Sequence, residues 1–429
     1  MGHDGIRVVL SLVFKAILGI PRIFHFETLD DPGFAILSGG SKVLTRQKLG
    51  DLVRRVPFVG VQRLMKLTAP ALKQAASHTI SIDEHAIARF TRKFSIRKGY
   101  HTIRNKHMKI EKLTFAFHTG TQQLLSLVAT RGHVNLKTIA EKLLPSIRRR
   151  AKGAQIRLVL DAGAAKSHGQ LFELIDHPRQ VTLVRVPRRA PYLKQWEQIP
   201  AQQWREVHED GPYTNAPPKV VHVADTVMLL RDPKTKSERH VRTIVVREQT
   251  RRGKDRWHGL WVFGEDQSDR WQLVEEFRTR QHHEQTYRVM LHDAYVDTAS
   301  SGYDKNSSNP DRPGFKQNAI TLYGWTAALA THALRSLADT LPAGFRRAHP
   351  RTLRRWFLST PAALFLGNGT LIVALQPRRN CDLWQHLIAP INQAAYRIPW
   401  LENRRLILSL DRDALLARRK MELIREGGL

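Results

Sequence analysis

Three acidic residues of this basic chain have the type and the placement that metal-assisted chemistry on phosphate requires: Asp83, Asp161 and Glu284. Asp83 closes the alternating run HTISID, Asp161 closes the apolar run IRLVLD, and Glu284 lies within a helical pattern. Carboxylates that hold two divalent ions about 3.5–4 Å apart activate a nucleophile and stabilise a leaving oxygen. We therefore expect the three acids to bind two Mg²⁺ or Mn²⁺ ions.

Taken singly, each of these acids has a simpler explanation. An Asp at the end of a strand is often a turn residue or a helix cap, and a Glu on a helix is often a surface acid. The three together are harder to explain in this way, because they occupy matching places in one pattern of strands and helices.

Alternating and apolar runs between residues 79 and 186 predict the elements that position two of the acids. The first three strands can pair through short turns, whereas the last two need helical crossovers and are expected to be parallel. This is the order of an RNase H-like core, in which the ends of the first and fourth strands are adjacent. Strands are expected at 79–83, 113–118, 123–130, 156–161 and 181–186, and helices at 136–152 and 167–177.

The third acid follows a stretch of different character. Residues 187–265 are rich in Pro, Trp and Arg, and they predict a small antiparallel β insertion that interrupts the core. The helical pattern of 271–291 then returns to the core sheet and carries Glu284. The strands of the insertion are expected at 220–230, 240–248 and 259–265.

These patterns predict an α/β fold whose core is a mixed five-stranded sheet with flanking helices. A helical region precedes the core, the β insertion interrupts it, and an α+β region follows it. The expected parts are a helical DNA-binding domain at 1–78, the first part of the core at 79–186, the insertion at 187–265, the last core helix at 266–300 and a C-terminal domain at 301–429.

The charge of the chain indicates the class of partner. Lys and Arg number 69 against 38 Asp and Glu, which gives a net charge of +31 over 429 residues, while 42% of the residues are hydrophobic. A globular chain with this excess requires a polyanionic partner, and nucleic acid is the first candidate. An anionic membrane is the second candidate, but no apolar run has the length of a spanning helix.

Cysteine content and the N-terminal pattern bear on the compartment. Cys381 is the single cysteine, which excludes a disulfide framework and a Cys-rich zinc site. A reducing cytoplasm fits this content, and a Cys-poor secreted protein fits it equally. The run 7–20 has a Lys within its apolar stretch and no small-residue cleavage site after it, so we expect an amphipathic helix there and not a signal peptide.

A basic segment follows the strand that is expected to end at Asp83. Residues 89–109 contain eight Lys and Arg residues with aromatic side chains among them. Cations interleaved with aromatic rings suit phosphate contact together with base stacking, although a solvated charged loop is the plainer explanation. In a chain of this charge we expect DNA contact. The residues expected to make it are Lys93, Arg97, Lys98, Tyr100, Arg104 and Lys106.

The segment FRTRQHHE resembles the Y-x2-R-x3-E-x6-K signature of DDE-class insertion-sequence transposases. Phe277 stands at the Tyr position, Arg280 at the Arg position and Glu284 at the position of the catalytic Glu. The final Lys position falls on Leu291, so the chain departs from the signature there, and Arg288 is the substitute expected for its phosphate contact. By this resemblance, Phe277, Arg280 and Arg288 are expected to contact DNA.

The resemblance covers most of 79–300, since the segments around Asp83 and Asp161 look like the first and second catalytic blocks of that family. It implies a transposase that cuts the ends of a mobile element and transfers the exposed 3′-OH into target DNA. It also implies terminal inverted repeats as the recognised sequence, a homodimer on DNA, and a bacterial cytoplasm with association to the nucleoid. Two alternatives stay open: an RNase H-like nuclease without strand transfer, and a non-enzymatic, domesticated DNA-binding protein.

Overall fold

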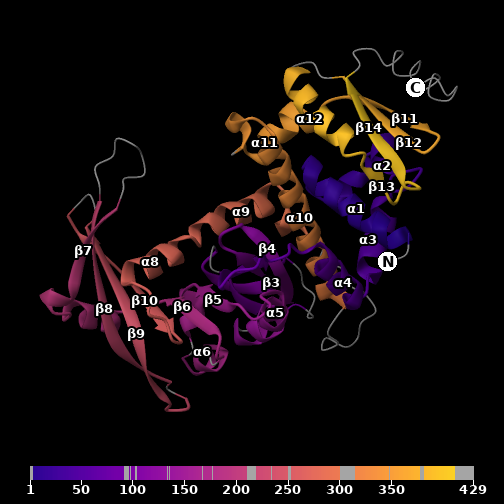
Figure 1. The fold of residues 1–429 in the computed structure, drawn as a ribbon. Coiled ribbons are helices and arrows are strands. Elements are labelled where there is room, and N and C mark those ends of the chain that lie inside the picture. The colour runs from indigo at the N-terminus through magenta and orange to yellow at the C-terminus, as the bar shows by residue number, and fades with distance from the viewer. Residues whose placement is uncertain are drawn as a thin grey trace. The chain divides into compact units, whose positions relative to one another are not determined.

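The computed structural model shows two compact units (Figure 1). The first comprises Met1–Thr68 and Thr286–Leu429, and we call it the terminal unit. The second comprises Ala69–Gln285, and we call it the central unit. The residues that the structure describes are 3–90, 96, 98–101, 104–132, 134, 136–166, 168–175, 177–209, 219–232, 234–249, 253–299, 315–346, 348–376 and 381–410.

The sheet of the central unit has the pairing directions that the sequence predicts. Its first strands are β1 (Ser77–Ala88), β2 (Lys98–His101), β3 (Lys106–His118), β4 (Gln123–Arg131), β5 (Gln155–Leu160) and β6 (Gln180–Arg185). β3 pairs antiparallel with β1, β2 and β4. β5 lies parallel to both β1 and β6. The order β4-β3-β1-β5-β6 therefore places β1 and β5 side by side.

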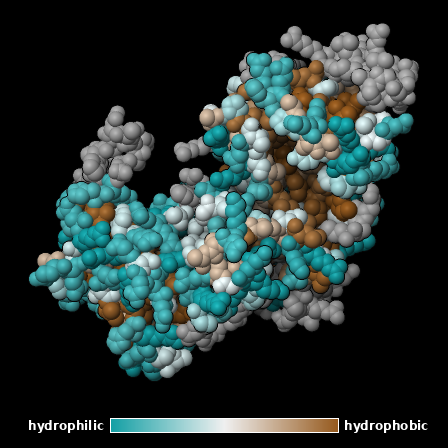
Figure 2. Space-filling model, viewed as in Figure 1, coloured by the Kyte–Doolittle hydropathy of each residue, from teal (hydrophilic) through white to brown (hydrophobic). Residues whose placement is uncertain are grey.

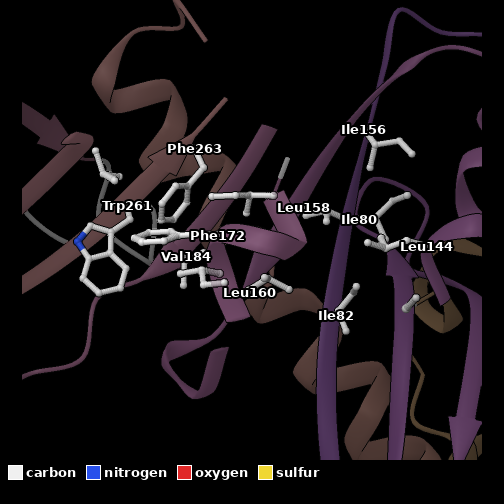
Figure 3. Packing of buried hydrophobic residues seen from close by; sticks show 14 of the residues in the cluster. Ile80, Ile82, Leu144, Ile156, Leu158, Leu160, Phe172, Val184, Trp261 and Phe263 are labelled. Carbon is white, nitrogen blue, oxygen red and sulfur yellow. The ribbon is translucent and has the colours of Figure 1, made fainter. Parts of the chain in front are cut away.

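Two helices cover one face of this sheet and supply the crossovers that parallel strands require. α5 (Leu136–Arg150) precedes β5, and α6 (His168–Ile175) precedes β6. Alternate residues of β1 and β5, among them Ile82 and Leu160, pack with these helices in a buried hydrophobic core (Figure 3). Because side chains alternate along a strand, the residue that follows each of them points to the opposite face of the sheet.

The insertion is antiparallel, as the sequence predicts, but it is not a separate sheet. It consists of α7 (Ala190–Glu197), β7 (Trp204–Glu209), β8 (Lys219–Arg231), β9 (Glu238–Gln249) and β10 (Asp255–Phe263). β10 pairs antiparallel with β6, so the core and the insertion share one continuous sheet (Figure 1). Gly259 permits close packing here, because a Cβ at this position would come within 2.4 Å of the buried ring of Trp196.

The single helix predicted over 271–291 is wrong, because two helices occupy this stretch. α8 (Arg270–Arg278) is followed by its C-cap residue Thr279, and α9 (Gln281–His292) begins after Arg280. The amide of Arg280 bonds to the carbonyl three residues earlier at 3.2 Å, which is the tight geometry of a 3₁₀ turn. This turn separates the two helices and places Arg280 between them.

α8 packs on the face of the sheet opposite to α5 and α6. Its buried residues Leu273 and Val274 contact a second hydrophobic cluster. That cluster includes Val159 of β5, Leu183 of β6 and Leu260 of β10. The helix that precedes Glu284 is thus held over β5, whose next position on this face after Val159 is Asp161.

The terminal unit joins the N-terminal helices to the C-terminal region. Its main elements are α1 (His3–Leu18), α2 (Pro32–Leu37), α3 (Arg46–Arg55), α4 (Phe58–Thr68), α10 (Phe315–Thr340), α11 (Pro350–Leu353), α12 (Cys381–Gln393), β11 (Ala362–Gly367), β12 (Thr370–Leu375), β13 (Arg397–Ile398) and β14 (Arg404–Leu410). α1, α3 and α4 pack against α10. The helix expected over 7–20 is present as α1, and a hairpin turn joins β11 to β12.

The visible surface over β7–β10 is mainly hydrophilic in the view of Figure 2. Among the described residues, no helix is both long enough and apolar enough to cross a membrane.

Candidate active site

Asp83 and Asp161 lie next to each other on adjacent strands. In the pairing of β1 with β5, the last paired residues are Ile82 and Leu160. Each acid is the next residue along the chain. The sequence predicts that this strand ends at Asp83, but β1 continues past it, because β3 pairs with β1 as far as Ala88. β5 ends at Leu160, which pairs with Ile82, so Asp83 has no paired residue on β5.

One guanidinium contacts all three predicted acids. Arg280 Nη1 donates to Asp83 Oδ2 at 3.2 Å, and Arg280 Nη2 donates to Glu284 Oε1 at 3.3 Å. Asp161 Oδ1 lies 3.9 Å from the same Nη2, which is within ion-pair distance but too long for a hydrogen bond. The structure therefore brings β1, β5 and the start of α9 together at Arg280.

The side chains at this place differ in exposure. Arg280 is buried, with 10% of its side chain exposed, whereas 45% of the Asp161 side chain and 47% of the Glu284 side chain are exposed. The cation thus lies beneath acids that solvent, or a bound ligand, can reach. A buried guanidinium beside several carboxylates is well compensated, because a buried cation needs nearby negative charge.

The pKa of the Asp83 carboxyl is raised above its ordinary value. Burial is the main cause, and the negative charges of Asp161 and Glu284 raise it further. Arg280 and the Glu84 amide, which donates to Asp83 Oδ1 at 2.8 Å, oppose this rise. The three acids therefore interact electrostatically, and additional positive charge at this place would favour ionised Asp83.

The break between α8 and α9 places Glu284 in the first turn of α9, where the helix dipole favours an acidic side chain. Arg280 and Glu284 are four residues apart and form an ion pair. Phe277 belongs to α8 and packs against the second hydrophobic cluster, so it lies on a different helix from Arg288. Arg288 is exposed on α9.

A buried polar network fixes α8 to the sheet one turn before the site. Glu276 of α8 accepts from Arg157 Nε at 2.8 Å and from Thr79 Oγ1 at 2.6 Å. Arg157 also pairs with Asp266 at 2.6 Å. Sequence reasoning missed this network, although Thr79 and Arg157 lie on the same face of β1 and β5 as Asp83 and Asp161.

The three acids match a divalent metal in ligand type, since Mg²⁺ and Mn²⁺ bind carboxylate oxygens. Asp161 Oδ1 is buried and accepts no hydrogen bond from the described residues, which leaves an oxygen free to coordinate. In those same residues, no three His, Cys, Asp or Glu side chains stand close enough together to hold an ion as they are placed. The Arg280 guanidinium contacts Asp83 and Glu284 instead.

The basic segment predicted as a loop contains a hairpin. Residues 98–101 form β2, and Lys106 begins β3, with Lys98, Arg104 and Lys106 exposed. Tyr100 is 41% exposed, and its ring packs edge to face on His107. The hairpin thus presents cations and an aromatic ring to solvent, which is the composition that nucleic-acid contact requires.

Other residues of the basic segment have different surroundings. Arg89 Nε bonds to Glu111 Oε2 at 2.7 Å with both side chains largely buried, so this pair stabilises the hairpin base. Arg104 lies 5.1 Å from the centre of the Phe90 ring, which is 77% exposed. Lys93 and Arg97, which the sequence predicts to contact DNA, lie outside the described residues.

Arg185 lies beside Asp161, although the sequence did not indicate it as a site residue. Its Nη1 lies 3.9 Å from Asp161 Oδ1. Leu160 and Val184 are the last paired residues of β5 and β6, so Asp161 and Arg185 are both the next residue on parallel neighbours. Both residues fall within the predicted strands 156–161 and 181–186, and only the register of β5 and β6 brings them together.

Comparisons with known proteins leave the family open. No protein-family model matches the chain, and no curated protein matches it. Among solved structures, the chain is similar to the cryo-EM structure of a piggyBac transposase synaptic complex with hairpin DNA, at a TM-score of 0.35 and 16% identity. The similarity covers 81% of this chain and 75% of that chain. Any functional conclusion therefore rests on the geometry of the site.

Proposed function

We propose that this chain is a DDE transposase. The observation that carries the proposal is the convergence of Asp83, Asp161 and Glu284, from three separate elements, on the guanidinium of Arg280. The guanidinium groups of Arg280 and Arg185 lie within ion-pair distance of these acids, so three carboxylates face two cations and one negative charge is left in excess. Such an excess inside a chain of net charge +31 suits divalent cations that act on a polyanion.

The proposed catalytic core is RNase H-like. Its sheet has the order β4-β3-β1-β5-β6, and the acids follow the paired parts of β1 and β5 and begin α9. The core would comprise 79–186 and 266–300, interrupted by the insertion at 187–265. The helices of 1–78 would recognise terminal inverted repeats, and 301–429 would form the C-terminal domain.

Asp83, Asp161 and Glu284 would hold two Mg²⁺ or Mn²⁺ ions, which supply Lewis-acid stabilisation of the attacking and leaving oxygens. Arg280 would then be able to donate hydrogen bonds to the non-bridging oxygens of the scissile phosphate. The network of Arg157 and Glu276 holds α8 in place, so Glu284 keeps its position beside the sheet.

The proposed reaction has two steps, each of which exchanges one P–O bond for another. Water first attacks the phosphodiester at the end of the element and displaces the 3′ oxygen, which leaves as a 3′-OH. That hydroxyl then attacks a phosphodiester of target DNA and displaces its 3′ oxygen. Joining two ends to one target suits a homodimer on double-stranded DNA.

The β2–β3 hairpin is the proposed DNA contact of the core. Lys98, Arg104 and Lys106 are exposed cations for phosphate, and Tyr100 offers a ring for stacking. Lys93 and Arg97 stay predicted contacts of the same segment. Arg288 and Phe277 stay predicted contacts on the signature, although the packed ring of Phe277 suits a structural role better.

The test is cleavage and joining of duplex DNA that carries the terminal sequence bordering the gene. The parent chain is expected to nick this duplex only with Mg²⁺ or Mn²⁺ and to join the 3′ end to a target plasmid. Asp161→Asn and Glu284→Gln are expected to lower both rates by about 10³-fold or more while DNA binding persists. Glu197→Gln, an exposed acid on α7, serves as the control.

Each outcome separates the alternatives. Cleavage that depends on Asp161 and Glu284 without joining identifies a nuclease. Binding with no cleavage by the parent identifies a non-enzymatic DNA-binding protein. Unchanged cleavage by Asp161→Asn or by Glu284→Gln would contradict the assignment of the catalytic acids.

A further inference from the structure

Asp83 and Asp161 lie side by side on neighbouring strands of the sheet. Three arginines, Arg185, Arg188 and Arg256, lie beyond them in the direction of β10. Arg185 follows Asp161 in this direction, as its contact with Asp161 Oδ1 shows. Arg185 is paired with Leu260 of β10, so these two side chains point to the same face. Arg256 is four residues from Leu260 on the same strand and therefore also lies on this face.

Arg188 completes the group. It follows β6, and its Nε donates to the carbonyl of Trp257 at 3.1 Å, which holds it against β10 beside Arg256. Burial, followed by the charges of Arg256 and Arg185, lowers the pKa of Arg188. The same three arginines contribute to the low pKa of His258, about 4, for which burial is the main cause. The guanidinium groups therefore share one electrostatic environment.

The nearby acid is already engaged. Glu248 on β9 raises the pKa of Arg188 and of His258, but its Oε1 accepts from Arg278 Nη2 at 2.9 Å. Arg188 and Arg256 are exposed, and Arg185 is half-buried. Clustered cations repel one another in the free protein, so an anionic ligand that contacts all three would relieve this repulsion.

We propose that Arg185, Arg188 and Arg256 form a track that binds the phosphate backbone of one DNA strand beside Asp161. DNA as the ligand rests on the proposed function, whereas the site itself rests on the geometry. Arg256 lies about 13 Å along β10 from the level of Arg185, at about 3.3 Å per residue. That distance corresponds to roughly four nucleotides at about 3.4 Å each. The insertion thereby contributes directly to strand binding next to the acids.

The test measures binding of a fluorescein-labelled 30-base-pair duplex by anisotropy over a range of salt, with EDTA present. The triple variant Arg185→Gln, Arg188→Gln and Arg256→Gln is expected to reduce the slope of log K against log salt by about 2 to 3, since each phosphate contact contributes about 0.9. Replacing the same three residues with Lys is expected to keep the slope, because phosphate accepts a point charge.

The control removes the same charge elsewhere in the central unit. Lys152, Lys234 and Lys236 are exposed and lie beyond the opposite ends of the strands, before β5 and in the β8–β9 turn. Their replacement with Gln is expected to leave the slope unchanged. An equal loss in this control, a parental slope in the Gln triple variant, or no duplex binding by the parent would overturn the track.

The single variant Arg256→Gln provides a milder test, because this residue is exposed and its change is expected to preserve folding. It is expected to lower the slope by about 0.9, and an unchanged slope would count against the track. The binding test uses no metal, so its failure is distinct from failure of the proposed reaction. A parent chain that shows the predicted slopes but never cleaves DNA would refute the transposase and leave the track.

Discussion

Arg280 Nη1 lies 3.2 Å from Asp83 Oδ2, although 197 residues separate the two along the chain. The contact joins the strand β1 to the junction of α8 and α9. It also supplies positive charge where Asp161 and Glu284 approach Asp83. Arg280 therefore supplies positive charge among the three carboxylates, which is the part that a divalent cation has in the proposed reaction.

Replacing Arg280 with Met should lower stability without metal, by about 1 to 3 kcal/mol, because the carboxylates lose their shared hydrogen-bond donor. Added Mg²⁺ should then raise the melting temperature of this variant more than that of the parent, since a ligand of the folded state stabilises it. Thermal unfolding with and without Mg²⁺ measures both effects. Arg149→Met, an exposed position on α5, is the control, and equal Mg²⁺ shifts in all three proteins would contradict the prediction.

The raised pKa of Asp83 implies that its charged form costs stability. For an acid with a raised folded pKa, the parent loses stability as pH rises from the unfolded value of 3.8 through the folded value. Asp83→Asn should therefore be more stable than the parent at neutral pH and similar to it below about pH 3.8. Melting temperatures across pH test this, with the exposed Asp30→Asn as control. A variant that is less stable than the parent at neutral pH would contradict it.

Glu276 is expected to be a positioning residue. Glu276→Gln leaves the largely buried Arg157 with one carboxylate fewer and should cost about 1 to 3 kcal/mol of stability. Cleavage should slow while the affinity for DNA stays the same, because Glu284 would lose its fixed placement. Denaturant unfolding and single-turnover cleavage measure the two effects. Glu275→Gln, exposed on the same helix, should change neither, and a matching loss there would argue against positioning.

Lys15 is buried in α1, with Nζ 4.7 Å from the centre of the Tyr323 ring, and burial lowers its pKa from 10.5 to about 7. Stability should rise as pH increases from about 7 towards 10.5, because the unfolded chain binds the proton that the folded chain has released. Lys15→Met should stabilise the protein most below pH 7, by several kcal/mol at about 1.4 kcal/mol per pKa unit.

The Lys15 effect should shrink towards pH 10, where the parent side chain is buried uncharged. Chemical unfolding at several pH values gives the difference, and Lys66→Met on the exposed face of α4 controls for the substitution itself. A stabilisation by Lys15→Met that is independent of pH would contradict the assignment of a buried titrating amine.

Much of the core could be predicted from local patterns, because alternation and solid apolar runs depend on residues close in sequence. The pairing of β1, β3 and β4 and the parallel pairing of β5 follow from such runs and from the length of their connections. The placement of Asp83 and Asp161 follows as well, since it needs only the ends of two neighbouring runs.

The differences arise where distant residues decide the structure. β1 continues past Asp83 because β3 pairs with it, and the local sequence carries no sign of that partner. The helix breaks before α9 although no Gly or Pro is present there, and Arg280 at the break is bonded to Asp83 and Glu284. Arg185 was missed because its relation to Asp161 depends on strand register.

The pairing of β10 with β6 has a consequence for how the chain avoids aggregation. β6 would otherwise be an edge strand, with unpaired amides and carbonyls that could recruit strands of other molecules. The insertion covers this edge with its own backbone over Leu260–Phe263. Excising 187–265 would therefore expose the unpaired backbone of β6 as an edge prone to association, in addition to removing part of the proposed arginine track.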